Sequence, residues 1–218
     1  MKLTNQWFYF IDAITPEKCD EIIELGHQLK FKEGEAAADL GELTDEERKI
    51  GRKNIHGKSK FRESGVVFTD SQDIYDLVFP FMLYANQEAG WGFDVVSCET
   101  PQITQYKKGQ FYNWHSDGTS DRLSMYTKEE VGDNELLLGN VRKLSMTILL
   151  NDGYKGGEFQ FKTQGGVKEK FETKIYPLDV LKKGSVIVFP SSMVHRITPV
   201  TKGVRYSLVG WFLGPPFK

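Results

Sequence analysis

Residues 184–212, "GSVIVFPSSMVHRITPVTKGVRYSLVGWF", decide the fold class of this chain. Their runs of valine, isoleucine and aromatic residues are separated by proline, serine and glycine, the pattern of short β-strands joined by tight turns. Similar runs occur upstream in "FDVVSCETPQITQYKKGQFYNWH" (93–115), "KLSMTILLN" (143–151) and "GEFQFKT" (157–163). Strands this short and this closely spaced predict a β-sandwich or barrel in the C-terminal half.

The N-terminal half has helical signals instead. After a strand-like run at 7–12, Thr15 and Pro16 form an N-cap and first helical residue, which predicts a helix to about Leu29. Residues 71–90 predict a second helix, and Pro80 within it predicts a kink or a split. We therefore expect one domain over 1–218, mostly β with an α layer. Residues 1–95 are the expected supporting layer and residues 96–216 the β core.

Composition excludes some classes of protein. The chain has 218 residues, which suits one sizeable core. Its net charge of −2 argues against a dedicated nucleic-acid-binding protein, whose binding face is usually strongly basic. A basic run at 48–62 is interpreted as the solvated face of a long surface loop. No stretch is long and apolar enough to cross a membrane, so we expect no membrane partner.

The two cysteines, Cys19 and Cys98, lie far apart in unlike contexts. We predict two free thiols rather than a disulfide, which fits a reducing compartment and a cytoplasmic location.

The segment "FYNWHSDG" (111–118) contains the first candidate functional residues. Residues i and i+2 of a strand point to the same face, so His115 and Asp117 can approach one metal ion. Alone, this pair is weak evidence, because a histidine and an aspartate at a turn are often only solvated. A second histidine, His195, follows an apolar strand and a small-residue turn. Taken by itself, His195 would be interpreted as a structural residue of the core.

Arg205 supports a binding site over plain core packing. It lies in a β-forming run, on the same face as Ser207, Val209 and Trp211. An unpaired buried charge is costly, so an inward arginine needs an anionic partner. If residues 201–202 formed a hairpin tip, Arg205 and His195 would lie roughly 10 Å apart along the ribbon. A small dicarboxylate could then chelate a metal at one end and pair with Arg205 at the other.

Two histidines and one carboxylate form the facial triad of non-haem Fe(II) oxygenases, which leaves positions on the ion open. The chain resembles the Fe(II)/2-oxoglutarate-dependent dioxygenases, and among them the prolyl 4-hydroxylase-like family. The resemblance covers about residues 100–216 and rests on "YKKGQFYNWHSD", "LSMTILLNDGYKGGEFQF" and the opening stretch, in that order. It implies a double-stranded β-helix (jelly-roll) core, with the N-terminal helices packed on it.

By that resemblance, His115, Asp117 and His195 match the iron ligands. Arg205 matches the residue that binds the distal carboxylate of 2-oxoglutarate, and Tyr106 and Thr147 match positions that assist it. Tyr112 and Trp211 resemble aromatic residues of the substrate pocket, with core packing as the alternative. The chain departs from some relatives at Leu149, where they place a tyrosine on the co-substrate. The remaining histidines, His27 and His56, are interpreted as structural.

The resemblance implies an enzyme that uses Fe(II), 2-oxoglutarate and O2, with ascorbate as a candidate reductant. Its expected substrate is a prolyl residue in a peptide or protein. One alternative keeps this chemistry but acts on a nucleic-acid base or a free amino acid. A second alternative is a non-catalytic β-barrel module that binds a metal or an anion.

Overall fold

The structure, a computed structural model, describes residues 6–34, 61–119, 124–164, 173–177 and 182–217. Most of the basic run at 48–62, including His56, therefore lies outside the described residues. The helices are α1 (Pro16–Leu29), α5 (Gln72–Glu88) and α6 (Lys128–Val131). The first strands in chain order are β1 (Phe8–Phe10), β2 (Lys32–Glu33), β3 (Arg62–Glu63), β4 (Gly65–Phe68), β5 (Ser97–Cys98), β6 (Gln102–Tyr106) and β7 (Phe111–His115).

The remaining strands follow α6 and make up most of the C-terminal half. They are β8 (Val141–Leu149), β9 (Lys155–Gly156), β10 (Phe159–Gln164), β11 (Thr173–Pro177), β12 (Val186–Pro190), β13 (Val194–Ile197), β14 (Val200–Lys202) and β15 (Arg205–Gly214). The strands predicted from apolar runs are thereby confirmed.

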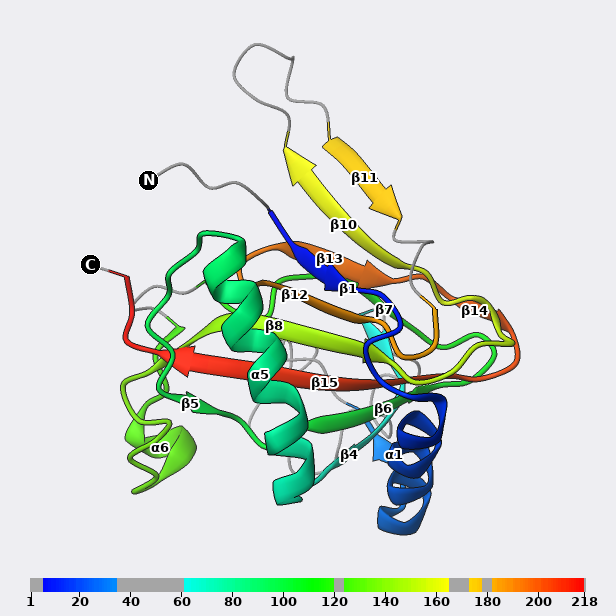
Figure 1. Ribbon diagram of the computed structural model, residues 1–218, viewed down its shortest axis with the longest axis horizontal. Helices are drawn as coiled ribbons and strands as arrows, with labels where there is room; N and C mark the ends of the chain where they lie inside the picture. Colours follow the sequence, from blue (N-terminus) through cyan, green and yellow to red (C-terminus); the bar gives the residue numbers. More distant parts are fainter. Residues whose placement is uncertain (1–5, 35–60, 120–123, 165–172, 178–181, 218) are drawn as a thin grey trace, which may run out of the picture.

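Two antiparallel sheets face each other as a jelly roll, as predicted (Figure 1). Within the described residues, the larger sheet has the order β1-β12-β8-β15-β6-β4-β2, and β5 pairs with β15 at one end. The smaller sheet has the order β11-β10-β13-β7-β3. The short strands β9 and β14 pair as a two-stranded ribbon where the chain crosses from one sheet to the other.

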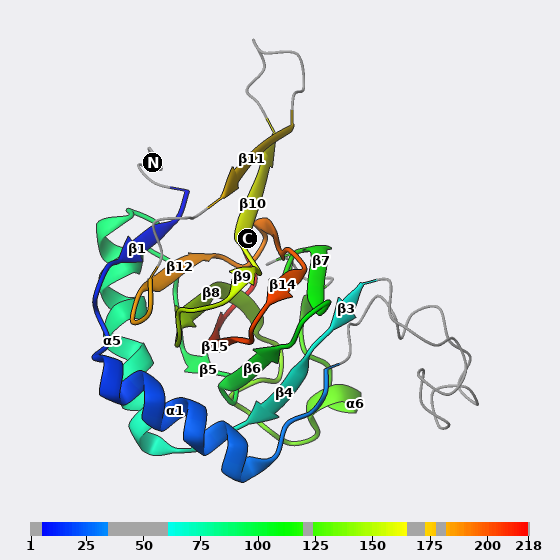
Figure 2. The ribbon, with the colours of Figure 1, turned by 90° about the vertical axis from the view of Figure 1, so that its right-hand side faces the viewer.

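Two helices, α1 and α5, cover the outer face of the larger sheet (Figure 2). Cys19 and Ile22 of α1 and Val78 and Met82 of α5 are buried in a cluster with the outward residues of β8, β12 and β15. A second cluster lies between the sheets and includes Phe159, Phe161 and Phe189. The larger sheet is therefore covered on both faces, which explains why β8 is buried along nearly its whole length.

Local signals account for both long helices. Thr15 accepts a hydrogen bond from the Lys18 backbone N–H at 3.3 Å and Pro16 occupies the first turn, so the predicted start of α1 is confirmed. The prediction of a split at Pro80 is wrong, because α5 runs through it as one helix. Pro80 lies on the exposed side, where water can satisfy the carbonyl that loses its intrahelical partner.

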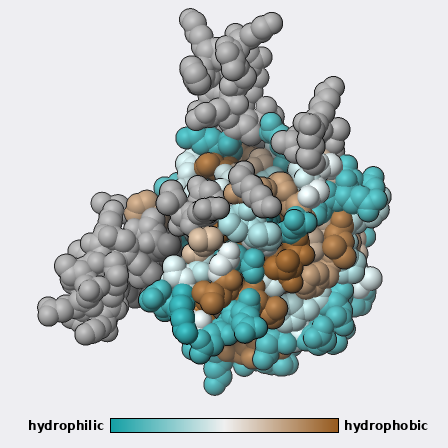
Figure 3. All heavy atoms as spheres, turned by 90° about the vertical axis from the view of Figure 1, so that its left-hand side faces the viewer, coloured by the Kyte–Doolittle hydropathy of each residue, from teal (hydrophilic) through white to brown (hydrophobic). Residues whose placement is uncertain are grey.

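Both cysteines are free, as predicted, with Cys19 buried and Cys98 partly buried. Burial raises the pKa of the Cys98 thiol to about 12. Among the described residues, no helix has the length and apolar character that a membrane crossing requires. Figure 3 shows the face at the left of Figure 1, where apolar side chains form small groups among hydrophilic ones.

The packing predicts which leucines matter for stability. Leu208 on β15 is fully buried, so Leu208→Ala should lower the free energy of unfolding by about 2–5 kcal/mol through lost burial and a cavity. Leu83→Ala on the exposed side of α5 should change it by at most about 0.5 kcal/mol. Urea denaturation of both variants checks the contrast, and equal losses would contradict this packing.

Candidate active site

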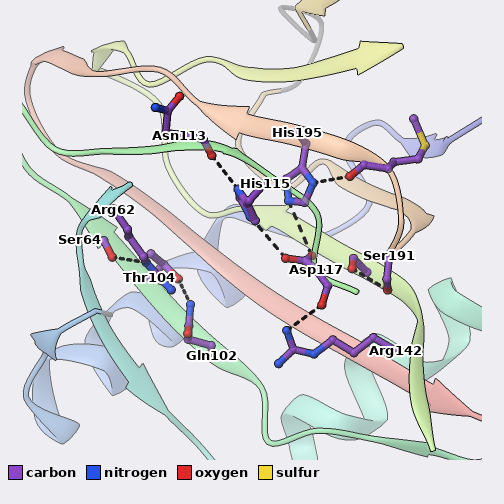
Figure 4. A network of polar contacts seen from close by, with 12 residues as sticks. Arg62, Ser64, Gln102, Thr104, Asn113, His115, Asp117, Arg142, Ser191 and His195 are labelled. Atoms are coloured by element: carbon purple, nitrogen blue, oxygen red, sulfur yellow. Dashed lines mark hydrogen bonds and ion pairs between the residues drawn. The ribbon is translucent and has the colours of Figure 1, made fainter. Parts of the chain in front are cut away.

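Three side chains that can ligate a metal converge between the sheets. His115 ends β7, Asp117 follows it, and His195 lies on β13 as the direct cross-strand partner of His115. One ligand atom from each residue lies within 4.8 Å of the others. Asp117 lies between the rings, with Oδ1 3.4 Å from His115 Nε2 and Oδ2 3.7 Å from His195 Nε2 (Figure 4).

Backbone carbonyls orient both imidazoles. His115 Nδ1 lies 2.8 Å from the Asn113 carbonyl oxygen, and His195 Nδ1 lies 2.9 Å from that of Met193. A carbonyl oxygen only accepts, so each Nδ1 carries the proton and donates. Each Nε2 therefore keeps its lone pair directed at the space beside Asp117, the arrangement that metal-binding histidines usually have.

The backbone of Asp117 is held by the turn between β12 and β13. Its N–H and that of Gly118 both donate to the Ser191 carbonyl, at 2.9 and 3.2 Å. The Ser191 hydroxyl lies 2.9 Å from that of Ser145 on β8. The short connection after β7 is thus fastened to the larger sheet, which fixes the direction of the Asp117 carboxylate.

Electrostatics favour the protonation states that metal binding requires. Burial lowers the pKa of His195 to about 4, although the neighbouring Asp117 opposes this shift. Burial by itself would raise the pKa of Asp117, but the two histidines and Arg142 outweigh it and hold this pKa well below its usual range. Near neutral pH the site therefore presents a carboxylate beside a neutral His195 imidazole, as ligation demands.

A cavity of about 350 Å³ extends from these three side chains. All eight side chains singled out from the sequence line it: His115, Asp117, His195, Arg205, Tyr106, Thr147, Tyr112 and Trp211. Residues from both sheets contribute, so the cavity exists only in the folded jelly roll.

Arg205 lies at one end of this cavity and is only 2% exposed. One guanidinium nitrogen donates to Ser207 Oγ at 3.0 Å, and the guanidinium lies 5.7 Å from the centre of the Tyr106 ring. Its Nε has no hydrogen-bond partner in the described part of the chain. A buried cation with an unsatisfied donor leaves room for an anionic ligand.

The expected hairpin between His195 and Arg205 is wrong. β13 pairs with β10 and β7 in the smaller sheet, whereas β15 pairs with β6 and β8 in the larger one. The intervening β14 pairs with β9, which takes the chain across from one sheet to the other. His195 and Arg205 therefore face each other across the cavity and are not neighbours along one ribbon.

The two aromatic candidates line the cavity and also contact other residues of its wall. Tyr112 stacks on the His115 ring with centroids 3.5 Å apart. Trp211 lies under the Arg142 guanidinium at 4.3 Å, and its indole Nε1 has no partner among the described residues. These contacts place both rings in the cavity wall beside the triad.

Sequence reasoning missed further charged residues in the cavity wall. Arg142 makes a two-pronged ion pair with Glu99, each N–O distance being 2.6 Å, and donates to the Asp117 carbonyl at 3.2 Å. Tyr126 also donates to Glu99, at 2.7 Å. In the sequence, the only sign of this ion pair was a charged residue, Arg142, directly before the strand-like run at 143–151.

Arg62 corrects the interpretation of the basic run as a solvated face. It is buried on β3, donates to Ser64 Oγ at 2.8 Å and lies over the Tyr112 ring at 4.7 Å. The last residue of that run thus belongs to the cavity wall.

Comparison with known proteins agrees with this geometry. The family model described as the 2OG-Fe(II) oxygenase superfamily matches residues 101–213. A PKHD-type hydroxylase of Synechococcus sp. is 31% identical over 50% of this chain and 39% of its own length. One from Rippkaea orientalis is 34% identical over 50% of this chain and 40% of its own length. The chain thus matches about two fifths of these curated relatives.

Solved structures show the same fold. A Pseudomonas putida prolyl-4-hydroxylase aligns with a TM-score of 0.59 at 19% identity, covering 96% of this chain and 92% of its own. A Trichoplax adhaerens prolyl hydroxylase, in complex with a hypoxia inducible factor peptide fragment, aligns with a TM-score of 0.59 at 11% identity. That alignment covers 96% of this chain and 84% of the other.

The Glu99–Arg142 pair yields a stability prediction. Glu99→Ala leaves a partly buried guanidinium without its carboxylate, so the free energy of unfolding should fall by about 1.5–3 kcal/mol. Glu24→Ala, on the exposed side of α1, should have little effect. Guanidinium chloride unfolding measures both, and a loss below about 1 kcal/mol for Glu99→Ala would show that the pair is dispensable.

Proposed function

Because this chain belongs to the 2OG-Fe(II) oxygenase superfamily, we propose that it hydroxylates a prolyl residue in a peptide or protein. That family uses Fe(II), 2-oxoglutarate and O2. The observation that carries the proposal is a single cavity whose wall contains two contrasting groups. One is a set of three metal-ligating side chains, and the other is a buried arginine with an unsatisfied Nε.

His115, Asp117 and His195 are the proposed iron ligands. Two imidazoles and one carboxylate suit Fe(II) and leave half of an octahedral ion open. When bound, iron and 2-oxoglutarate supply the oxidising chemistry that inserts one oxygen atom of O2 into a substrate C–H bond. The carbonyls of Asn113 and Met193 hold the imidazoles in the required tautomer.

Arg205, Tyr106 and Thr147 are the proposed partners of 2-oxoglutarate. Arg205 and Tyr106 are cross-strand neighbours, so both reach the same end of the cavity. Burial raises the pKa of the Tyr106 phenol, which therefore stays protonated and can donate to a carboxylate. Thr147 lines the cavity on β8, next to Val209 of β15. Two donors and a fixed cation fit a carboxylate with directional hydrogen bonds.

Tyr112 and Trp211 are proposed to bind the substrate residue beside the iron ligands. Flat aromatic faces with polar rims suit a pyrrolidine ring, which is compact and apolar. The names of the PKHD-type relatives and the prolyl hydroxylase fold neighbours support a peptidyl proline as substrate. The peptide bound in the Trichoplax structure supports a peptide or protein partner.

The test is succinate release with Fe(II), 2-oxoglutarate, ascorbate and panels of substrates. Proline-containing peptides should stimulate turnover and gain one oxygen atom by mass spectrometry. Stimulation by nucleosides or free amino acids alone would identify one of the alternative substrates. Iron binding with no turnover on any panel would identify a binding module.

Three variants examine the ligands in the same assay. His115→Ala, Asp117→Ala and His195→Ala should each abolish turnover and iron binding, because each removes a ligand atom at the cavity. His27→Ala is the matched control, since His27 lies on α1 and contacts Tyr206 instead of the cavity. Near-normal iron binding in a triad variant would remove that residue from the ligand set.

Arg205 separates an oxygenase from a generic metal site. Arg205→Ala should raise the apparent constant for 2-oxoglutarate about 10- to 150-fold, the value of a hydrogen bond to a charged group. Arg205→Lys should keep part of the binding, because a point charge replaces a planar fork. Iron affinity should change little in either variant.

The control for these titrations is Arg196→Ala, whose guanidinium lies on Trp114 and donates to Gln160 on another surface. Titration of 2-oxoglutarate at fixed Fe(II) compares the four proteins. Equal constants for wild type and Arg205→Ala would mean that this cation serves another ligand.

A further inference from the structure

Two polar residues of β6, Gln102 and Thr104, have no role in metal or co-substrate binding as described above. Gln102, Thr104 and Tyr106 alternate along this strand and all line the cavity. Their cross-strand partners on β15 are Val209, Ser207 and Arg205. Gln102 is thus four residues from the Arg205 end, about 13 Å at 3.3 Å per residue. Val209 also pairs with Thr147 on its other side, so Gln102 and Thr147 line the cavity at the same level, on opposite sides of β15.

The Gln102 amide is fixed by its neighbour. Its Nε2 donates to Thr104 Oγ1 at 2.7 Å, and the two residues are only 4% and 1% exposed (Figure 4). Among the described residues, the fully buried side-chain atoms without a hydrogen-bond partner are Arg205 Nε and Trp211 Nε1, so Gln102 Oε1 is not one of them. Because Thr104 holds Nε2, Oε1 is an oriented acceptor in the cavity wall that a bound ligand can reach.

An apolar side chain stands next to this acceptor. Phe68 on β4 is the direct cross-strand partner of Gln102, also lines the cavity, and yet is 53% exposed. A phenylalanine this exposed at a cavity mouth offers a contact surface for an apolar group of the ligand. The acceptor and the ring together suit a residue that carries both a donor and an apolar side chain.

We propose that Gln102, oriented by Thr104, accepts a hydrogen bond from a backbone N–H of the bound peptide, whose side chain packs on Phe68. The inference rests on the proposed function and names a second contact of that substrate. A peptidyl proline has no N–H, so the donor belongs to a residue adjacent to the target proline. The subsite therefore selects peptides over free proline and favours an apolar neighbour.

The test is a cycle of protein and substrate changes. The probes are an acetylated alanine–proline–leucine peptide amide and two ester analogues, in which the alanine or the leucine N–H is replaced by oxygen. Gln102→Met keeps the side-chain size and removes the acceptor. It should weaken binding of the amide peptide about 2- to 12-fold, the net value of one neutral hydrogen bond.

The ester that lacks the recognised N–H should bind wild type more weakly than the amide peptide does, by a factor similar to that of Gln102→Met. The Gln102→Met variant should bind that ester and the amide peptide with equal affinity. Binding is measured anaerobically with Fe(II) and 2-oxoglutarate by tryptophan fluorescence, and KM by succinate release. If each ester loses as much affinity relative to the amide peptide in Gln102→Met as it does in wild type, another group recognises the N–H, and the inference is wrong.

Two further variants control for misfolding and test the hydrogen bond between Gln102 and Thr104. Gln105→Met is the matched control, because Gln105 lies on the same strand and donates to Tyr206 on the opposite face. It should leave peptide binding unchanged. Thr104→Val removes the acceptor that orients Gln102, so peptide binding should weaken while thermal unfolding stays cooperative.

Phe68→Ala completes the set. It should weaken binding of the leucine peptide more than that of its glycine counterpart, because only leucine contacts the ring. Wild type that turns over no proline peptide overturns the proposed function together with this inference. Active wild type with unaffected Gln102→Met overturns this inference alone.

Discussion

The antiparallel register between β7 and β13 is the constraint on which the candidate site depends. It makes His115 and His195 direct cross-strand partners, so two ligand atoms meet without any long connection. A slip of one residue would turn one imidazole to the outer face of the sheet. The register also changes along this pair: a step of two residues on β13, from His195 to Ile197, is matched by a step of three on β7, from His115 to Tyr112. This bulge explains how Tyr112 and His115, which regular alternation would separate, both line the cavity.

The larger sheet supplies two of the charged residues in the cavity wall. Arg205 from β15 and Arg142 from β8 both enter the cavity, but their surroundings differ. Arg142 is neutralised by Glu99, so it serves to hold Trp211 and the Asp117 carbonyl in place. Arg205 has only a neutral hydroxyl and ring beside it among the contacts described. The difference in pairing marks Arg205 as the cation that a ligand can reach.

The helices matter to this site indirectly. α1 and α5 bury the outer face of the larger sheet, so β6, β8 and β15 are held on one side by apolar packing. The inner faces of these strands can then carry the polar residues Gln102, Thr147 and Arg205, because the apolar core of the sheet lies on its outer face, under the helices. A polar cavity in a small jelly roll is stable only because the sheet is packed on its other face.

Local signals in the sequence determined much of this protein. Alternation and turn residues predicted the strands, Thr15 and Pro16 predicted the start of α1, and the spacing of His115 and Asp117 predicted a pair facing one point. These patterns are readable because they involve neighbours in the chain. The resemblance to a known family added Tyr106, Thr147, Tyr112 and Trp211, all of which line the cavity.

Tertiary structure alone decided the rest. Glu99 and Arg142 are 43 residues apart, and Arg62 reaches the Tyr112 ring from a separate strand. The crossing between β13 and β15 likewise depends on β14 pairing with β9, which the expected hairpin did not include. Ion pairs and sheet exchanges of this kind form between segments that approach only after the two sheets have packed. No spacing in the sequence records them, because the burial that makes them favourable belongs to the assembled fold.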